Sequence, residues 1–572
     1  MFFSALAADY DGTLATDGRV DAATIAELVK LRESGRKLIL VTGRILDDLS
    51  RVFSQLELFD RVVVENGALL YHPQTKEEII LAPIPPPAFI DRLQSLHIEP
   101  LSIGRVIVAT WTPEDKRVLD AIRDLGFELQ ITYNKGAVMV LPSGTNKASG
   151  LAAALAELEL SPRNVVGVGD AENDGAFLDL CGCAVAVANA LESVKKSTDW
   201  VTTGARGLGV QELTKELIAT DLNGRLLRRI SNIALGTADD GREATIDWRG
   251  KHILLAGTSG GGKSTFITSL IEQICARGLQ LVALDPEGEY EGLKEVIAFG
   301  DSKTVPSLTG VDQLLIKPDQ NAVLNLLAVP FPSRPNFTAD VISHLDALRV
   351  RSGRPHWIIL DEAHHLLPAA WTPAARGLPR NGGLVLVTIE PKMLAPAVVE
   401  AMDFILAVGD APMEVLQQAA AMTHTELSGE SQQELEPGHA LFWALGSKES
   451  PQVIRLAISK QSHQRHRRKY AEGHLGESAS FYFRGPERRL NLRAENLHMF
   501  LQMAEGVDDE TWLHHLQGGD ITRWFRDVIK DEELAAEAKS AEDPSIDPVA
   551  GRKRIREAIE RWYTGPDATF PP

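Results

Sequence analysis

Short apolar runs alternate with amphipathic segments through the first 213 residues of the chain. The apolar runs end in polar residues and lie at 38–44, 62–68, 165–174 and 184–189. Segments between them, such as 22–34 and 147–160, repeat apolar side chains at the three- and four-residue spacing of a helix. This alternation of strands and helices predicts an α/β domain with a parallel sheet and crossover helices.

A proline-rich segment at 83–87 (PIPPP) interrupts the alternation. It begins an insert of about 60 residues that ends near Gly144. We expect this insert, at about 83–144, to form a small α+β cap on a domain that spans residues 1–213.

A second alternation of strands and helices predicts a second α/β domain over residues 246–460. Its predicted strands lie at 252–257, 279–288, 356–363, 383–390 and 404–409. Between the two domains, residues 214–245 are charged and contain RLLRR at 225–229, so we expect a helical connector there.

The remaining residues predict a basic linker and an all-α C-terminal domain. The linker at 461–474 contains HQRHRRKY, and residues 475–572 are rich in Glu, Arg, Trp and Leu. An amphipathic pattern predicts that the core of this last domain contains Trp512, Leu513, Leu516, Trp524, Phe525 and Val528.

Length and charge narrow the functional classes. A chain of 572 residues is too long for one hydrophobic core, so we expect several domains. Its 59 Lys and Arg residues against 78 Asp and Glu residues give a net charge of −19. This acidic balance disfavours nonspecific binding to nucleic acid, although the basic linker leaves local binding open. The three cysteines lack metal-site spacing and no uncharged run reaches about 18 residues, so we expect a cytoplasmic protein without a membrane segment.

Chemically active side chains follow the predicted strands of the first domain. Asp9 and Asp11 follow the first strand, Thr42-Gly43-Arg44 the second, and DAEND (170–174) a later one, while Lys147 opens the helix after the cap. Ligands bind beyond the carboxyl ends of parallel strands, so we expect these residues to converge. Carboxylates can supply a nucleophile, an acid–base group and Mg²⁺ ligands, and a hydroxyl and a lysine can neutralise phosphoryl oxygens.

Residues 1–213 resemble the haloacid dehalogenase (HAD) superfamily, in its sugar-phosphatase-like, Cof-type branch. The resemblance rests on DYDGTL, LVTGR, GTNKASGL and GDAEND in this order, with ENGA at 65–68. It implies a Mg²⁺-dependent phosphatase for a small phosphorylated metabolite, with Asp9 as nucleophile and Asp11 as acid and base. It also implies phosphate contacts from Thr42, Gly43 and Lys147, and Mg²⁺ ligands from Asp9, the Asp11 backbone carbonyl, Asp170 and Asp174.

A glycine-rich loop lies between a strand and a helix of the second domain. Its sequence GTSGGGKST has the spacing GxxxxGKS, in which backbone N–H groups close around phosphates at a helix N-terminus. We expect Lys263 to reach the β- and γ-phosphates of ATP and Ser264 to hold Mg²⁺. The predicted ATP-binding residues are Gly257, Thr258, Ser259, Gly260, Gly261, Gly262, Lys263, Ser264 and Thr265.

The motif WIILDEAHH ends another predicted strand of this domain. We expect Asp361 to hold Mg²⁺ through water and Glu362 to polarise the attacking water, which favours ATP hydrolysis. The adjacent histidines at 364–365 and 514–515 point apart on a helix, so we do not expect them to be metal ligands.

Residues 246–458 resemble the HerA/FtsK-like ATPases, especially the HerA branch, through the P-loop, LVALDPEGEY (281–290), DEAH and LVTIE (386–390). Ile389 stands where that family has a polar sensor glutamine, and Glu390 is a candidate substitute. The resemblance implies an ATPase that assembles as a homo-oligomeric ring. Arg376 and Arg380 are candidate arginine fingers for a neighbouring subunit's site.

The sequence therefore predicts a HAD phosphatase fused to a HerA-like ATPase, whose nucleotide state gates or assembles the phosphatase. Three alternatives remain: a nucleic-acid translocase that trims phosphate ends, a kinase–phosphatase pair acting on one metabolite, and a nucleotide-switched scaffold with a silent HAD domain. Glu362 beside Asp361 favours water over a metabolite as the phosphate acceptor. The net charge and Ile389 disfavour the nucleic-acid machine.

Overall fold

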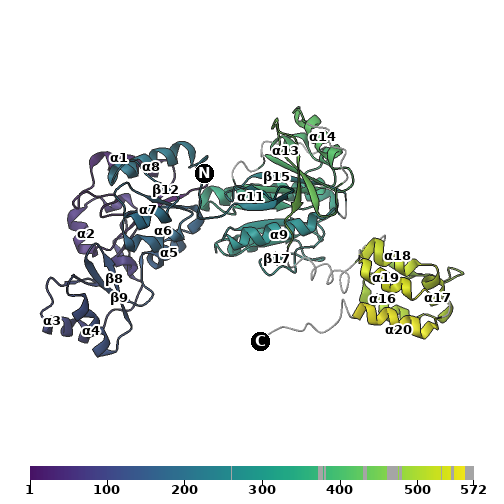
Figure 1. Ribbon diagram of the computed structural model, residues 1–572, viewed down its shortest axis with the longest axis horizontal. Coiled ribbons are helices and arrows are strands. Elements are labelled where there is room, and N and C mark those ends of the chain that lie inside the picture. The colour runs from purple at the N-terminus through teal and green to yellow at the C-terminus, as the bar shows by residue number, and fades with distance from the viewer. Residues whose placement is uncertain are drawn as a thin grey trace. The chain divides into compact units, whose positions relative to one another are not determined.

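The computed structural model describes residues 1–258, 261–370, 378, 382–428, 435–459, 475, 480–529, 531–542 and 546–560 (Figure 1). The chain divides into two compact units, residues 1–457 and 458–572. Among the described helices, none is both long enough and apolar enough to cross a membrane. The predicted basic linker at 461–474 lies outside the described residues.

The first α/β domain is built on an eight-stranded sheet in the order β12-β11-β10-β1-β2-β3-β4-β5. Its parallel strands are β1 (Ala5–Asp9), β2 (Lys37–Val41), β3 (Arg61–Val64), β10 (Val165–Gly169), β11 (Cys183–Ala186) and β12 (Trp200–Val201). Strands β4 (Leu69–His72) and β5 (Glu77–Ile80) extend it antiparallel. Every residue of β1 is buried, as expected for a central strand covered on both faces.

Helices cover both faces of this sheet (Figure 1). Helices α1 (Ala22–Glu33) and α8 (Gly207–Thr220) pack against each other, and α5 (Lys147–Glu157) packs against α6 (Gly175–Leu180). The shorter helices of this domain are α2 (Leu46–Val52) and α7 (Glu192–Ser197). The predicted parallel α/β architecture is therefore confirmed.

The insert forms a cap of four antiparallel strands and two helices. The strands run in the order β6 (Ser102–Ile103), β7 (Val108–Trp111), β9 (Ala137–Pro142) and β8 (Leu129–Asn134). Helices α3 (Pro87–Ser95) and α4 (Asp115–Leu125) form a separate small core with this sheet. The cap has the α+β composition that the sequence predicts.

An eleven-stranded sheet forms the second α/β domain, in the order β14-β13-β23-β22-β21-β15-β20-β19-β16-β18-β17. The parallel strands are β15 (His252–Gly257), β16 (Leu281–Asp285), β17 (Ile297–Phe299), β18 (Ala322–Asn325), β19 (Trp357–Leu360), β20 (Gly383–Thr388) and β21 (Phe404–Val408). Its helices are α9 (Lys263–Ala276), α10 (Leu308–Leu315), α11 (Arg334–Ser352), α12 (Ala363–Leu366), α13 (Pro396–Glu400) and α14 (Pro412–Thr423).

The predicted helical connector at 214–245 is wrong beyond the end of α8 at Thr220. Strands β13 (Ile233–Ala238) and β14 (Glu243–Ile246) form a hairpin instead. Together with β22 (His439–Ala444) and β23 (Gln452–Leu456), this hairpin extends the large sheet antiparallel. Pairing with β23 provides partners for the hairpin's backbone groups, so the second sheet begins at Ile233 rather than near residue 246.

The C-terminal unit is helical, as predicted, and also contains a two-stranded ribbon. Its helices are α16 (Leu497–Gly506), α17 (Asp509–Gln517), α18 (Asp520–Trp524), α19 (Glu532–Ser540) and α20 (Pro548–Ile559), with a π-helical turn at Phe525–Ile529. The ribbon pairs β24 (Phe481–Phe483) with β25 (Leu492–Ala494). The predicted core residues Trp512, Leu516, Trp524 and Phe525 are buried in one cluster, with Leu513 and Val528 packed against it.

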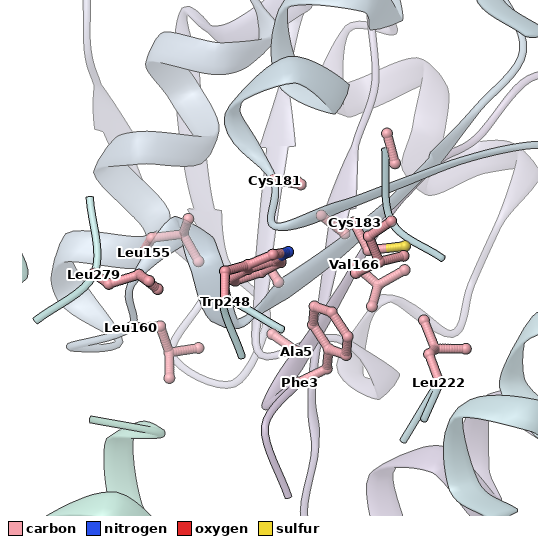
Figure 2. Close-up of a cluster of buried hydrophobic side chains, with 14 of the residues drawn as sticks. Phe3, Ala5, Leu155, Leu160, Val166, Cys181, Cys183, Leu222, Trp248 and Leu279 are labelled. Carbon is pink, nitrogen blue, oxygen red and sulfur yellow. The ribbon is translucent and has the colours of Figure 1, made fainter. Parts of the chain in front are cut away.

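The two α/β domains share one continuous apolar core, part of which Figure 2 shows. Phe3, which precedes β1, and Trp248, which precedes β15, are both buried in it. The rings of Phe2 and Trp248 meet edge to face at 5.3 Å. Since both residues precede their strands, the domains join at the amino ends of β1 and β15.

Candidate active sites

A buried group of carboxylates and one lysine lies at the carboxyl end of β1. Asp9 is the last residue of β1, and Lys147 is the first residue of α5, whose N-terminus is capped by the Asn146 side chain. The Lys147 Nζ atom lies 2.5 Å from Asp9 Oδ1 and 2.6 Å from Asp174 Oδ1. The predicted nucleophile and phosphate-binding lysine are therefore in direct contact, although the chain separates them by 138 residues.

Three carboxylates of this group form a compact oxygen donor set. Asp9, Asp170 and Asp174 are buried, and each offers an oxygen within 4.8 Å of the others. The second oxygen of Asp174 accepts the backbone N–H groups of Asp170 and Ala171, at 2.8 and 2.9 Å, which fixes its orientation. Several hard oxygen ligands at this spacing fit Mg²⁺.

Burial and mutual repulsion shift the titration of these groups. Burial, followed by the charge of Asp174, raises the pKa of Asp9 to about 8, although Lys147 opposes the shift. Burial also raises the pKa of Asp170. Burial alone would lower the pKa of Lys147, but the carboxylates of Asp174 and Asp9 raise it overall. The lysine therefore stays charged while the carboxylates compete for positive charge.

The Asp11 side chain faces Arg44 rather than Asp9. Arg44 holds it with two bonds, from Nε to Oδ2 at 2.7 Å and from Nη2 to Oδ1 at 2.8 Å. Arg44 also bonds Asp48 and lies over the ring of Tyr10. In the sequence, Arg44 is among the residues expected to follow the second strand, but no role is predicted for it.

Side chains from three other segments converge beside Thr42 and Gly43. Thr42 is buried, and a Cβ atom on Gly43 would lie 3.3 Å from Met139 Sδ of the cap. The Asn173 amide donates to Asn66 Oδ1 at 3.1 Å beside this glycine. Among the described residues, Asn66 Nδ2 and Asn173 Oδ1 have no hydrogen-bond partner, and exchanging N and O in both amides leaves one donor and one acceptor unpaired.

The P-loop residues that the structure describes lie at the end of β15 and the start of α9. Gly257 has φ of 146°, and a Cβ there would come within 2.0 Å of the Val408 backbone oxygen, so only glycine fits. The Lys263 ammonium donates to the backbone oxygens of Gly257 and Thr258 at 2.7 and 3.0 Å. The described part of the predicted ATP-binding loop also includes Gly261, Gly262, Ser264 and Thr265. Two predicted ATP-binding residues, Ser259 and Gly260, lie outside the described residues.

Tyr290 bridges carboxylates at two strand ends of the second domain, Asp285 at the end of β16 and Asp361 after β19. The Tyr290 hydroxyl donates to Asp361 Oδ2 at 2.7 Å, and the Tyr290 N–H donates to Asp285 Oδ2 at the same distance. Burial raises the pKa of Asp285 and of Asp361 to about 7 each. Tyr290 and Asp285 belong to the quoted LVALDPEGEY stretch but were not predicted as site residues.

The histidine pair at 364–365 lies closer together than a regular helix predicts. The two ring centroids are 4.0 Å apart, and donor atoms of Glu362, His364 and His365 lie within 4.8 Å of one another. The expectation that these rings point apart is therefore wrong. Glu362 has a left-handed backbone with φ of 43°, and α12 is one short turn, so regular helical spacing does not apply.

The structure describes the predicted sensor positions, Ile389 and Glu390, but not the candidate arginine fingers. Ile389 is partly exposed after β20, and Glu390 pairs with Lys392 at 2.7 Å. The Thr388 hydroxyl lies 3.4 Å from His364 Nδ1. Arg376 and Arg380 lie outside the described residues.

Residues 6–103 and 98–213 match the family model of haloacid dehalogenase-like hydrolases. The first domain is a haloacid dehalogenase-like hydrolase domain. A phosphoglycolate phosphatase of Methanothermobacter thermautotrophicus is 29% identical over 225 residues, which cover 37% of this chain and 98% of that protein. Phosphoglycolate phosphatase 2 of Saccharolobus solfataricus is 29% identical over 223 residues, 37% of this chain and 92% of that protein.

A solved haloacid dehalogenase-like hydrolase from Bacteroides thetaiotaomicron is 18% identical to this chain, with a TM-score of 0.33. The alignment covers 38% of this chain and 99% of that protein. Residues 234–337 match the family model of the central domain of helicase HerA. The matched segment begins within β13, in agreement with a second domain that starts at Ile233.

Proposed function

We propose that the haloacid dehalogenase-like domain is a Mg²⁺-dependent phosphomonoesterase. The contact of Lys147 with Asp9 and Asp174, inside the set of three clustered carboxylates, supports this most directly. Asp9, Asp170, Asp174 and the backbone carbonyl of Asp11 would hold the ion. When bound, Mg²⁺ would offset negative charge on the phosphoryl group.

The proposed reaction has two steps, both carried by residues of this chain. Asp9 attacks phosphorus and forms an aspartyl-phosphate, while Asp11 gives a proton to the leaving alcohol. Asp11 then takes a proton from the water that hydrolyses this intermediate. Thr42, the Gly43 backbone and Lys147 neutralise the phosphoryl oxygens, and Arg44 orients Asp11.

The proposed substrate is a small phosphorylated carboxylic acid such as 2-phosphoglycolate. The similarity of this domain to proteins named phosphoglycolate phosphatase supports that class. The test is release of phosphate from a panel of phosphorylated metabolites, with aryl phosphate as a generic substrate. We expect Asp9→Asn to lower the rate by about 10³-fold or more, whereas Asp120→Asn on the cap surface leaves it unchanged.

We propose that the second domain binds and hydrolyses ATP. Lys263 and Ser264 at the start of α9, with Asp361 and Glu362 after β19, are the residues proposed to do so. ATP with Mg²⁺ should stabilise the protein thermally, and Lys263→Ala should remove that stabilisation. Glu362→Gln should retain binding and lose hydrolysis, so loss of both would contradict the role proposed for Glu362.

We further propose that the nucleotide state of the second domain gates the phosphatase or assembles the chain into a ring. The shared core connects the two domains, and Asp9 and Gly257 lie at the carboxyl ends of β1 and β15, opposite the amino ends where the domains join. The test compares phosphatase rate and mass in solution with and without a non-hydrolysable ATP analogue.

The match to the HerA central domain also favours a second candidate function, a nucleic-acid machine. In that case, DNA or RNA should stimulate ATP hydrolysis at low salt, and the stimulation should fall steeply as salt rises. Absence of stimulation by any nucleic acid would remove this candidate and leave the metabolite phosphatase unaffected.

A further inference from the structure

A lysine of the cap reaches the carboxylates of the phosphatase site. Lys135 lies in the turn between β8 and β9, and its Nζ atom is 2.6 Å from Asp170 Oδ2. The Lys135 side chain is 48% exposed, whereas Asp170 is fully buried. A Cβ atom on Gly12 would lie 3.0 Å from this ammonium, so Lys135 also approaches the loop that follows Asp9.

The hairpin that carries Lys135 is fixed at its tip. Lys135 and Gly136 have φ values of 47° and 90°, which form the tight turn, and the Thr112 N–H donates to Gly136 O at 3.0 Å. Met139 of β9 packs near Gly43 of the catalytic loop. The turn therefore presents the lysine to the site from a supported backbone.

The cap is also anchored through Glu65, which is fully buried. Its carboxylate accepts the backbone N–H groups of Arg105, Val106 and Ile107 at 2.8, 2.7 and 2.9 Å. Glu65 has φ of 52°, a strained conformation for a non-glycine residue, and these three bonds stabilise it. These bonds hold the cap against the first domain, and in this position Lys135 contacts Asp170.

When the site holds the proposed Mg²⁺ ion, Lys135 would not be needed to neutralise Asp170. Asp170 is one of the proposed ligands of the cation, and a carboxylate that ligates a cation has its charge offset. With a cation bound to Asp170, the Lys135 ammonium would lie beside the reacting centre and be free to bind another anion. A half-exposed ammonium in this place can form a charge-assisted hydrogen bond with an anionic group of the substrate.

We propose that Lys135 binds the carboxylate of a small phosphorylated acid and thereby gives the phosphatase its selectivity for doubly anionic substrates. This inference rests on the proposed phosphatase function and adds the residue that recognises the second charge. In a two-carbon acid, one carbon separates the carboxyl group from the ester oxygen. Such a substrate is short enough for Asp9 to attack its phosphorus while Lys135 binds its carboxylate.

The test uses a pair of substrates that differ mainly in this charge, 2-phosphoglycolate and ethyl phosphate. We expect Lys135→Ala to raise KM for 2-phosphoglycolate by about 10- to 100-fold with little change in kcat, since it removes a charge-assisted bond. KM for ethyl phosphate should stay unchanged, and Lys135→Arg should restore part of the difference. Lys116→Ala, which removes an exposed cap lysine on α4, should change neither substrate.

Two outcomes would overturn the proposal. Equal losses for both substrates would mean that Lys135 acts on the site in general, and no change for either would mean that it only balances the carboxylates of the free enzyme. Binding of 2-phosphoglycolate to the Asp9→Asn variant, measured by calorimetry with and without Lys135→Ala, separates binding from turnover. If no substrate is hydrolysed in an Asp9-dependent way, the proposed phosphatase function itself fails.

Discussion

The Nε2 atom of His356 lies 3.0 Å from the side-chain oxygen of Asn164, and this bond joins the two α/β domains. The other ring nitrogen, Nδ1, accepts the backbone N–H of Gln280 at 2.8 Å, so the ring is neutral with its proton on Nε2. The Asn164 amide donates in turn to the Phe2 backbone oxygen at 2.7 Å. A chain of polar groups thus crosses the apolar contact.

We expect this histidine to make the protein less stable in mild acid. Burial, followed by the charge of Arg354, lowers the pKa of His356 well below its usual value of 6.5. The unfolded chain takes up a proton near pH 6.5 and the folded chain does not. The contribution of His356 to the free energy of unfolding is therefore fully present above about pH 6.5. It is lost as the pH falls below that value, by up to about 1.4 kcal/mol per pH unit for one proton.

The measurement is the free energy of unfolding in urea between pH 7.5 and 5.5. His356→Gln should be less stable at neutral pH but should show a flatter dependence in this range. His498→Gln, at an exposed histidine of the C-terminal unit, should keep the wild-type slope. An unchanged slope in His356→Gln would assign the acid sensitivity to other groups.

A second prediction concerns the apolar part of the same contact. Trp248 is 1% exposed and packs in the shared core, so Trp248→Ala should cost about 3–5 kcal/mol. Because the lost contacts join the two domains, calorimetry should resolve their unfolding into separate transitions. Trp111→Ala, at a half-exposed tryptophan of the cap, should leave the melting profile nearly unchanged. A single transition at wild-type temperature in Trp248→Ala would contradict this role.

Much of the phosphatase site could be predicted because it depends on a general property of parallel sheets. Asp9 ends β1, and Thr42 and Asp170 directly follow the neighbouring strands β2 and β10, whose carboxyl ends lie at the same edge of the sheet. Lys135 and Asn66 could not be found in this way. Lys135 reaches Asp170 only through the docking of the cap, and Asn66 lies in a strained turn whose Glu65 carboxylate is held by backbone N–H groups of another segment.

The wrong prediction of a helical connector at 214–245 shows a second limit of prediction from sequence. Local charge around RLLRR favoured a helix, yet the chain beyond it forms strands. The alternation in IALGTA and the turn residues Asp239-Asp240-Gly241 were the available signal for a hairpin. What stabilises the hairpin is its pairing with β23, more than 200 residues away, which no local pattern contains.

A third prediction tests whether Arg44 acts through Asp11. Arg44→Ala should lower kcat for ethyl phosphate by about 10- to 100-fold, since general acid catalysis contributes roughly 10²–10⁴-fold and needs an oriented acid. For p-nitrophenyl phosphate the loss in the first step, measured as the pre-steady-state release of nitrophenolate, should be much smaller, because nitrophenolate leaves without a proton. Asp11→Asn should show the same contrast, and Arg51→Ala, a nearby exposed arginine, should show none. Equal losses for both esters would indicate that Arg44 binds the phosphoryl group instead.

The fourth prediction concerns Tyr290, whose hydroxyl donates to Asp361, a proposed residue of the ATPase site. Tyr290→Phe leaves a buried carboxylate with one donor fewer, and a hydrogen bond to a charged group contributes about 1.5–3 kcal/mol. We therefore expect about a 10- to 100-fold loss in ATP hydrolysis, or a rise of similar size in the Mg²⁺ concentration needed for it. Tyr133→Phe is a matched control, since that tyrosine donates to Asp115 on the exposed surface of the cap. Wild-type ATP hydrolysis and Mg²⁺ dependence in Tyr290→Phe would show that Asp361 is positioned without this hydroxyl.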